Sequence, residues 1–170
     1  MDELNSIASR KKKIMVEFVQ IHLQNNRLLF FWVLRMSTIT ASALVAEKVW
    51  KDIQSTHSVS NEQLSILHLL FGKNLERATR IVDQRGVKRM LGEPSGRSIF
   101  QVVGESKRKE EYLCFASDYC GCYSFFYDIV NRGEQLCCKH QLAARLSSSL
   151  GTCIDVNMSD HDLALILSQL

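Results

Sequence analysis

Apolar residues in the first half of the chain recur at the spacing of amphipathic helices. In residues 38–54 they are Leu44–Val45, Val49 and Ile53, which predicts a helix with these side chains facing inward. The polar run Ser55–Ser58 ends the pattern.

The helix that follows has a well-marked start. Ser60 can cap it, and Gln63, three residues later, completes the capping-box pattern. Gly72 ends this helix, and Gly86 ends a second helix predicted over residues 74–84. The expected inward residues are Leu64, Leu67, Leu70 and Phe71 in the first helix and Leu75, Ala78 and Ile81–Val82 in the second. The two helices are expected to form a packed hairpin.

The pattern then changes to short β-branched and apolar runs. Residues 87–91, 98–103 and 112–116 are predicted strands. The turn residues Gly92–Gly96 separate the first two strands, and the charged segment Lys107–Lys109 separates the second from the third. We therefore expect a three-stranded antiparallel meander.

The last third consists of short elements. The aromatic segment 123–130 is expected to form one or two helical turns, and Lys139–Leu150 is a predicted helix that ends at Gly151. Ser159 can cap a final helix, with Asp162 at its third position. The elements together predict an α+β fold with N-terminal helices, a meander and C-terminal helices.

Three regions are expected along the chain: a poorly ordered extension over 1–35, a helical region over 36–86, and the meander with the C-terminal helices over 87–170. The longest strongly apolar run, Leu28–Leu34, is far shorter than the roughly 20 residues of a membrane span. No secretory signal is evident, so we expect an intracellular protein with reduced thiols.

Charge is unevenly distributed. Residues 1–35 hold six Lys/Arg and three Asp/Glu, whereas residues 36–170 hold fifteen of each sign. Within the latter, residues 73–109 carry a net charge of +6 and residues 110–170 carry −5. The chain therefore does not present a uniformly basic surface, although a local basic patch is possible in the middle third. The candidate nucleic-acid contacts there are Arg97, Lys107, Arg108 and Lys109.

All six cysteines lie within residues 114–170, and four side chains stand out. Cys120 and Cys122 are separated by one residue, and Cys138 and His140 repeat this spacing after an intervening segment of fifteen residues. Three thiolates and one imidazole suit tetrahedral zinc, and four protein ligands leave no open position for catalysis. Lys139, between two ligands, is placed to offset the net negative charge of such a site.

Other interpretations of these residues remain open. Cys137 could compete with Cys138, but only Cys138 has the Cys-x-His spacing to His140. A metal hydrolase or thiol enzyme is the least favoured class, because the sequence has no His-Glu-x-x-His motif. The aromatic residues of 123–130 could stack on bases, but we expect them to pack the small zinc core, since acidic residues surround them. These aromatic residues are Tyr123, Phe125, Phe126 and Tyr127.

A Cys-x-Cys pair followed by a Cys-x-His pair resembles the SWIM-type zinc finger. The likeness extends over roughly residues 40–170, to the family of SWIM-type zinc finger domain-containing protein 7, the SWIM subunits of Shu-type recombination complexes. The motifs that carry it are Leu70-Phe71-Gly72, Pro94-Ser95-Gly96-Arg97, Phe100-Gln101-Val102, Tyr119-Cys120-Gly121-Cys122 and Leu136-Cys137-Cys138-Lys139-His140. Cys137 departs from the family pattern, in which an apolar residue usually precedes the third ligand.

The resemblance implies a ββα-like finger with one structural zinc ion, and it carries over Cys120, Cys122, Cys138 and His140 as the ligands. It further implies a non-enzymatic nuclear subunit that pairs with a RecA-like Rad51 paralogue. Together the two would promote Rad51 filament assembly on single-stranded DNA in homologous recombination and DNA repair, including meiosis. Any contact with single-stranded DNA would be weak or indirect. Neither a membrane nor a small-molecule substrate is expected as a partner. The alternative is a stand-alone nucleic-acid-binding zinc finger.

Overall fold

The computed structural model describes residues 41–105, 110–168 and 170. Residues Ala43–Leu170 form one compact unit. The predicted extension 1–35 and the predicted turn Lys107–Lys109 lie outside the described residues. In the described part, no helix is long and apolar enough to cross a membrane.

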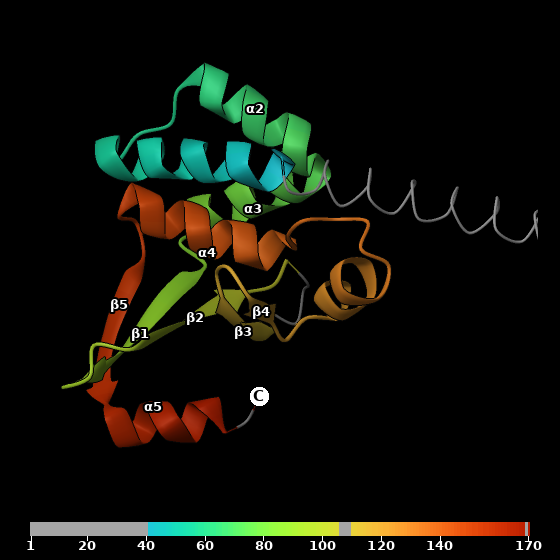
Figure 1. Cartoon of the computed structure of the whole chain (residues 1–170). Coiled ribbons are helices and arrows are strands. Elements are labelled where there is room, and N and C mark those ends of the chain that lie inside the picture. Colours follow the sequence, from blue (N-terminus) through green and yellow to red (C-terminus); the bar gives the residue numbers. More distant parts are fainter. Residues whose placement is uncertain (1–40, 106–109, 169) are drawn as a thin grey trace, which may run out of the picture. The chain divides into compact units, whose positions relative to one another are not determined.

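The fold mixes helices with one sheet, as the α+β prediction stated (Figure 1). Residues 41–56 are helical, and the chain then turns back twice before it enters the sheet. The further elements are α2 (Asn61–Phe71), α3 (Lys73–Asp83), β1 (Val87–Glu93), β2 (Ser98–Val103), β3 (Glu111–Phe115), β4 (Tyr119–Cys120), the π-helical turn η1 (Phe125–Asn131), α4 (Lys139–Leu150), β5 (Ile154–Ser159) and α5 (Asp160–Leu167).

The sheet has five strands in the order β4-β3-β2-β1-β5. The predicted antiparallel meander of β1, β2 and β3 is confirmed, with Met90 opposite Ile99 and Phe100 opposite Cys114. Two strands were not predicted. β4 is a two-residue strand that adds a fourth antiparallel strand beside β3. β5 follows α4 and lies parallel to β1, where Val156 pairs with Met90.

Helices cover the two faces of the sheet unequally. α4 lies between the sheet and the N-terminal helices, and the main core forms there from α3, α4 and the inward residues of the strands (Figure 1). On the opposite face α5 packs Leu163 against Met90 and Ile99, which form a second, smaller cluster. Alternation along each strand places these two sets of side chains on opposite faces.

Most of the predicted helix ends are confirmed. Ser60 and Gln63 form a complete capping box at α2, and the Ser159 hydroxyl accepts the backbone N–H of Asp162 at α5. α3 ends differently from the prediction. Arg85, with φ 53°, takes the left-handed conformation expected of a C-terminal glycine, and the N–H of Gly86 bonds back to the carbonyl of Ile81.

The apolar stripe predicted for the first helix is buried only in its second half. Leu44 is 67% exposed and Val45 is also exposed, whereas Val49 and Ile53 are buried as expected. Trp50 turns inward instead, with its ring centroid 6.3 Å from that of Phe71 on α2. A buried indole removes more apolar surface from water than either exposed residue would, and this sets the rotation of the helix. Leu64 of α2, also predicted inward, is exposed.

Candidate metal centre

The structure brings four predicted side chains together, although they come from two distant segments. Cys120 ends β4 and Cys122 follows it, while Cys138 precedes α4 and His140 lies in the first turn of that helix. One ligand atom from each residue lies within 4.8 Å of the other three, and all four side chains are buried. Such a cluster could hold a metal ion.

A tight hairpin positions the first pair. β3 and β4 are antiparallel, so that Cys114 lies opposite Cys120. The N–H of Gly121 donates to the carbonyl of Leu113 at 3.0 Å, which holds the residue between the two cysteines against β3. Cys122 therefore follows Cys120 back into the core instead of continuing the strand.

The second pair is positioned by a helix cap. Cys138 is the N-cap of α4: its Sγ accepts the N–H of Gln141 at 3.4 Å, and the Gln141 side chain accepts the N–H of Cys138 at 3.2 Å. The partial positive charge of a helix N-terminus stabilises a thiolate at this position. His140, two residues later, is directed into the same cluster.

An aromatic ring holds the imidazole in place. The rings of Tyr112 and His140 are stacked, with centroids 4.4 Å apart and an interplanar angle of 22°. The Tyr112 hydroxyl donates to a carboxylate oxygen of Glu110 at 2.7 Å, and this bond raises the pKa of the tyrosine to about 12. Tyr112 was not predicted as a site residue. Its only signal is that it lies two residues before Cys114 on the same face of β3.

One pair of donor atoms has the separation expected of ligands on a tetrahedral ion. Ligands bound about 2.0–2.3 Å from a zinc ion would be roughly 3.5–3.8 Å apart. His140 Nδ1 lies 3.7 Å from Cys120 Sγ. The other ring nitrogen, Nε2, is buried without a hydrogen-bond partner among the described residues. The 3.7 Å separation points to Nδ1 as the ligand atom, so the unpaired Nε2 is not itself evidence for the ion.

The three thiols of the cluster shift one another's pKa values. Hydrogen bonds from Cys120 and then from Cys138 lower the pKa of the Cys122 thiol. The pKa of Cys120 is raised by its hydrogen bonds with Cys114 and Cys122, and that of Cys138 by its hydrogen bonds with Cys120 and Cys122. A cation among the sulfurs would favour ionisation of all three thiols.

Two neighbours of the ligands lie outside the cluster. Cys137 is half-buried, its backbone carbonyl accepts a hydrogen bond from Asn74 Nδ2 at 3.1 Å, and burial raises its pKa to about 11. The Lys139 ammonium lies 2.9 Å from Glu105, whose carboxylate also accepts from Arg77 at 2.6 Å. The predicted role of Lys139 beside the sulfurs stays a prediction.

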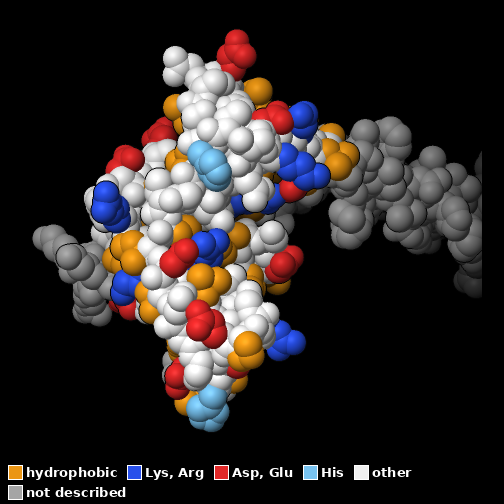
Figure 2. Space-filling view, turned by 90° about the vertical axis from the view of Figure 1, so that its left-hand side faces the viewer, with side chains coloured by type: hydrophobic (Ala, Val, Ile, Leu, Met, Phe, Trp, Pro, Cys, Tyr) orange, Lys and Arg blue, Asp and Glu red, His pale blue; other side chains and the backbone are white. Residues whose placement is uncertain are grey.

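Of the predicted nucleic-acid contacts, the structure describes Arg97. Arg97 is exposed in the turn between β1 and β2, and Lys107, Arg108 and Lys109 lie outside the described residues. On the face that carries β5, basic and acidic side chains are interspersed (Figure 2). Other basic residues of the middle third form ion pairs: Arg77 and Arg80 share Glu105, Lys88 pairs with Glu111, and Arg89 with Asp155.

The expectation that the aromatic segment packs the zinc core was wrong for most of its members. Phe125 is 7% exposed and belongs to the core. Tyr123, Phe126 and Tyr127 are exposed.

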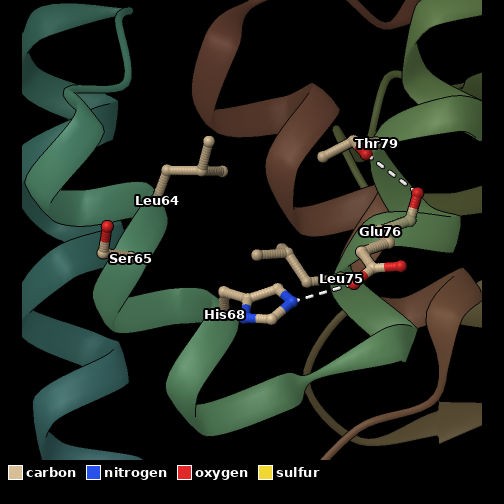
Figure 3. A pocket seen from close by; sticks show the side chains of 6 residues that line it. All are labelled: Leu64, Ser65, His68, Leu75, Glu76 and Thr79. Atoms are coloured by element: carbon tan, nitrogen blue, oxygen red, sulfur yellow. Dashed lines mark hydrogen bonds and ion pairs between the residues drawn. The ribbon is translucent and has the colours of Figure 1, made fainter.

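A hollow of about 390 Å³ lies between α2 and α3, away from the four ligands (Figure 3). His68 Nε2 lies 2.9 Å from Glu76 across it. The hydroxyl groups of Ser65 and Thr79 each bond to a carbonyl of their own helix. The hydroxyls are therefore engaged within their helices and are not paired with the histidine.

Comparison with known proteins identifies the family. The chain is 40% identical over 130 residues to zinc finger SWIM domain-containing protein 7 of Danio rerio, covering 74% of this chain and 91% of the relative. It is 34% identical to the Homo sapiens protein of that name, over 68% and 81% of the two chains, and 24% identical to the Dictyostelium discoideum homolog, over 72% and 78%. No family model and no solved structure matches. At this identity and coverage, the chain belongs to the zinc finger SWIM domain-containing protein 7 family.

Proposed function

We propose that the protein is a non-enzymatic, zinc-binding adaptor that pairs with a RecA-like Rad51 paralogue and promotes Rad51 filament assembly in homologous recombination. The observation that carries the proposal is the set of four buried protein ligands in a chain of this family. Three thiolates and an imidazole prefer zinc, and four protein ligands leave no position for a reacting water. The metal would therefore serve folding.

Exposed apolar side chains support a role as a subunit. Leu69 of α2 is 85% exposed and Tyr123 is 77% exposed, and both are large residues that gain stability when a partner covers them. A protein that works in a nuclear complex would cover such residues in the assembled state.

Direct binding of nucleic acid is the alternative, and the charges favour it less. Arg77, Lys88 and Arg89 are each paired with a carboxylate, which reduces the cationic charge available to phosphates. The metal centre itself lies in the acidic third of the chain. We therefore expect any contact with single-stranded DNA to pass mainly through the partner.

The test is to co-express the full chain with the Rad51 paralogue of the same organism and to measure zinc and partner in the purified material. We expect stoichiometric zinc by mass spectrometry of the metal, and a complex that separates as one species. Cys122→Ser and His140→Ala should lower zinc content and partner recovery together, whereas Asp128→Asn should leave zinc content unchanged. A monodisperse protein that carries zinc but has no affinity for the paralogue would refute the adaptor role.

Steep salt dependence of DNA binding by the protein alone would support the alternative function instead. The expected nuclear location is checked by fluorescence microscopy of the tagged full chain in its own organism.

A further inference from the structure

The turn that connects the two ligand pairs is apolar on two opposite sides. Phe125 and Ile129 point inward and pack in the main core. Four other large residues recur at helical spacing on the outer side, with exposures between 41% and 77%. We call this set the aromatic face: Tyr123, Phe126, Tyr127 and Val130. A solvated helix normally carries polar residues on its outer side, so a continuous apolar face indicates a binding surface.

The aromatic face is ordered before any partner arrives. The rings of Tyr123 and Tyr127 are stacked, with centroids 5.5 Å apart and an interplanar angle of 13°. The Phe126 ring lies edge-on to the Tyr119 ring, with centroids 6.0 Å apart. Cys122 and Cys138 flank this segment in the sequence. In Figure 1 the segment is the unlabelled orange helix that lies between β4 and α4 along the chain. Rigid aromatic side chains lose little entropy on binding and commonly dominate interface energies.

The charges near the face select the kind of partner. Asp128 lies in the same turn, and Asp118 precedes Tyr119. The guanidinium of Arg132 already lies 5.4 Å above the Tyr127 ring while it pairs with Glu134 at 2.6 Å. This contact is an example, within the chain, of a cation held between an aromatic ring and a carboxylate. The same carboxylates repel phosphate groups.

We propose that the aromatic face is the docking site for a protein segment that carries Arg or Lys beside apolar side chains, contributed by the RecA-like partner. The proposal rests on the proposed function for the identity of that partner. The basic side chains of the segment would approach the ring faces and the carboxylates, and its apolar side chains would cover Phe126 and Val130. Zinc would act on this contact indirectly, because its ligands fix both ends of the segment that carries the face.

The experiment titrates the zinc-loaded full chain onto the immobilised Rad51 paralogue. Tyr123→Ser combined with Phe126→Ser should weaken binding roughly 30-fold or more, the effect of losing central aromatic contacts. Zinc content and the far-ultraviolet circular dichroism spectrum should stay at the wild-type level, because both side chains are exposed. Leu165→Ser, which removes an exposed apolar residue on α5 outside the aromatic face, is the matched control and should bind like the wild type.

Charge provides an independent arm. Asp118→Lys combined with Asp128→Lys should slow association by about 10-fold at low salt, and the difference should shrink as sodium chloride is added. Asp83→Lys on α3 changes an exposed charge outside the face and should have little effect.

The outcomes separate this inference from the proposed function. If the wild type does not bind the paralogue at all, the proposed function fails, and this inference fails with it. If the wild type binds and the Tyr123→Ser/Phe126→Ser variant binds equally well, only the aromatic face is refuted.

Two other occupants would also overturn the proposal. If the wild type formed a homodimer and the double variant were monomeric but still bound the paralogue, the occupant of the face would be a second copy of the chain. If the double variant lost the wild-type affinity for a labelled oligothymidylate but still bound the paralogue, the face would be a base-stacking surface.

Discussion

Cys138 combines two structural roles that a pair of substitutions can separate. Its sulfur belongs to the cluster of four ligands, and it also accepts the Gln141 N–H as the N-cap of α4. Serine is a good N-cap but does not supply a thiolate, whereas alanine supplies neither group. Cys138→Ser therefore tests the metal ligand alone, and Cys138→Ala tests the ligand and the cap together.

The two contributions differ in size. Loss of an N-cap costs about 1 kcal/mol of stability. With free zinc buffered at about 1,000 times the wild-type dissociation constant, zinc binding would stabilise the folded protein by about 4.1 kcal/mol. We therefore expect Cys138→Ser to lose most of the zinc-dependent stability, and Cys138→Ala to lose about 1 kcal/mol more. In the presence of a chelator the serine variant should match the wild type to within about 1 kcal/mol, because the cap is conserved.

The assay is urea unfolding of the full chain in metal-buffered and chelator-containing solutions, with zinc content measured on the same samples. Cys137→Ser is the control, because Cys137 lies next in sequence but outside the cluster. It should keep zinc and its stabilising effect. If Cys138→Ser retained stoichiometric zinc and the full response to zinc, Cys138 would not be a ligand, and the assignment of the cluster would be refuted.

Three further predictions concern the surroundings of the site and the sheet. Tyr112→Ala removes the ring stacked on His140 and should weaken zinc affinity by about 10- to 100-fold in a chelator competition, whereas Tyr112→Phe should keep nearly wild-type affinity. Gly104→Ala places a Cβ 2.9 Å from the Tyr112 ring, so it should lower the free energy of unfolding by about 1–3 kcal/mol and also weaken zinc; unchanged zinc affinity would show that the ring does not support the imidazole. Arg89 lowers the pKa of Asp155, so this pair stabilises the fold above the ordinary carboxyl pKa of 3.8 and loses its effect as the pH falls below that value; Asp155→Asn should cost less than about 1 kcal/mol at pH 7 and nothing in strong acid, and a deficit that persisted in acid would contradict an electrostatic origin.

Local chemistry was sufficient to predict much of the fold. β2 and α4 have the predicted bounds, because turn residues precede the strand and glycine ends the helix. The capping box of Ser60 depends on residues three apart, so it too is visible in the sequence. The cluster of the metal centre could be proposed for the same reason, since each pair of ligands has one intervening residue and only one long-range contact must be assumed.

Features that depend on distant pairing could not be predicted in this way. The run Ile154-Asp155-Val156-Asn157-Met158 alternates as a strand should, but its partner β1 lies more than sixty residues earlier in the chain. β5 is also an edge strand with mostly exposed side chains, so no strongly apolar run marks it. The rotation of helix 41–56 has a similar cause, because the burial of Trp50 depends on Phe71 in a different helix.

The aromatic segment shows why a metal site changes the usual relation between apolar sequence and burial. In a small region without metal, rings such as Tyr123 and Phe126 would be needed in the core, because few other residues could join the hairpin to the helix. Four coordination bonds would make that connection with very little apolar surface, and Phe125 then fills the space that remains beside the ligands. The other rings are free to lie on the outside without loss of the fold. Under the proposed docking role, these exposed rings are the surface that a partner would cover.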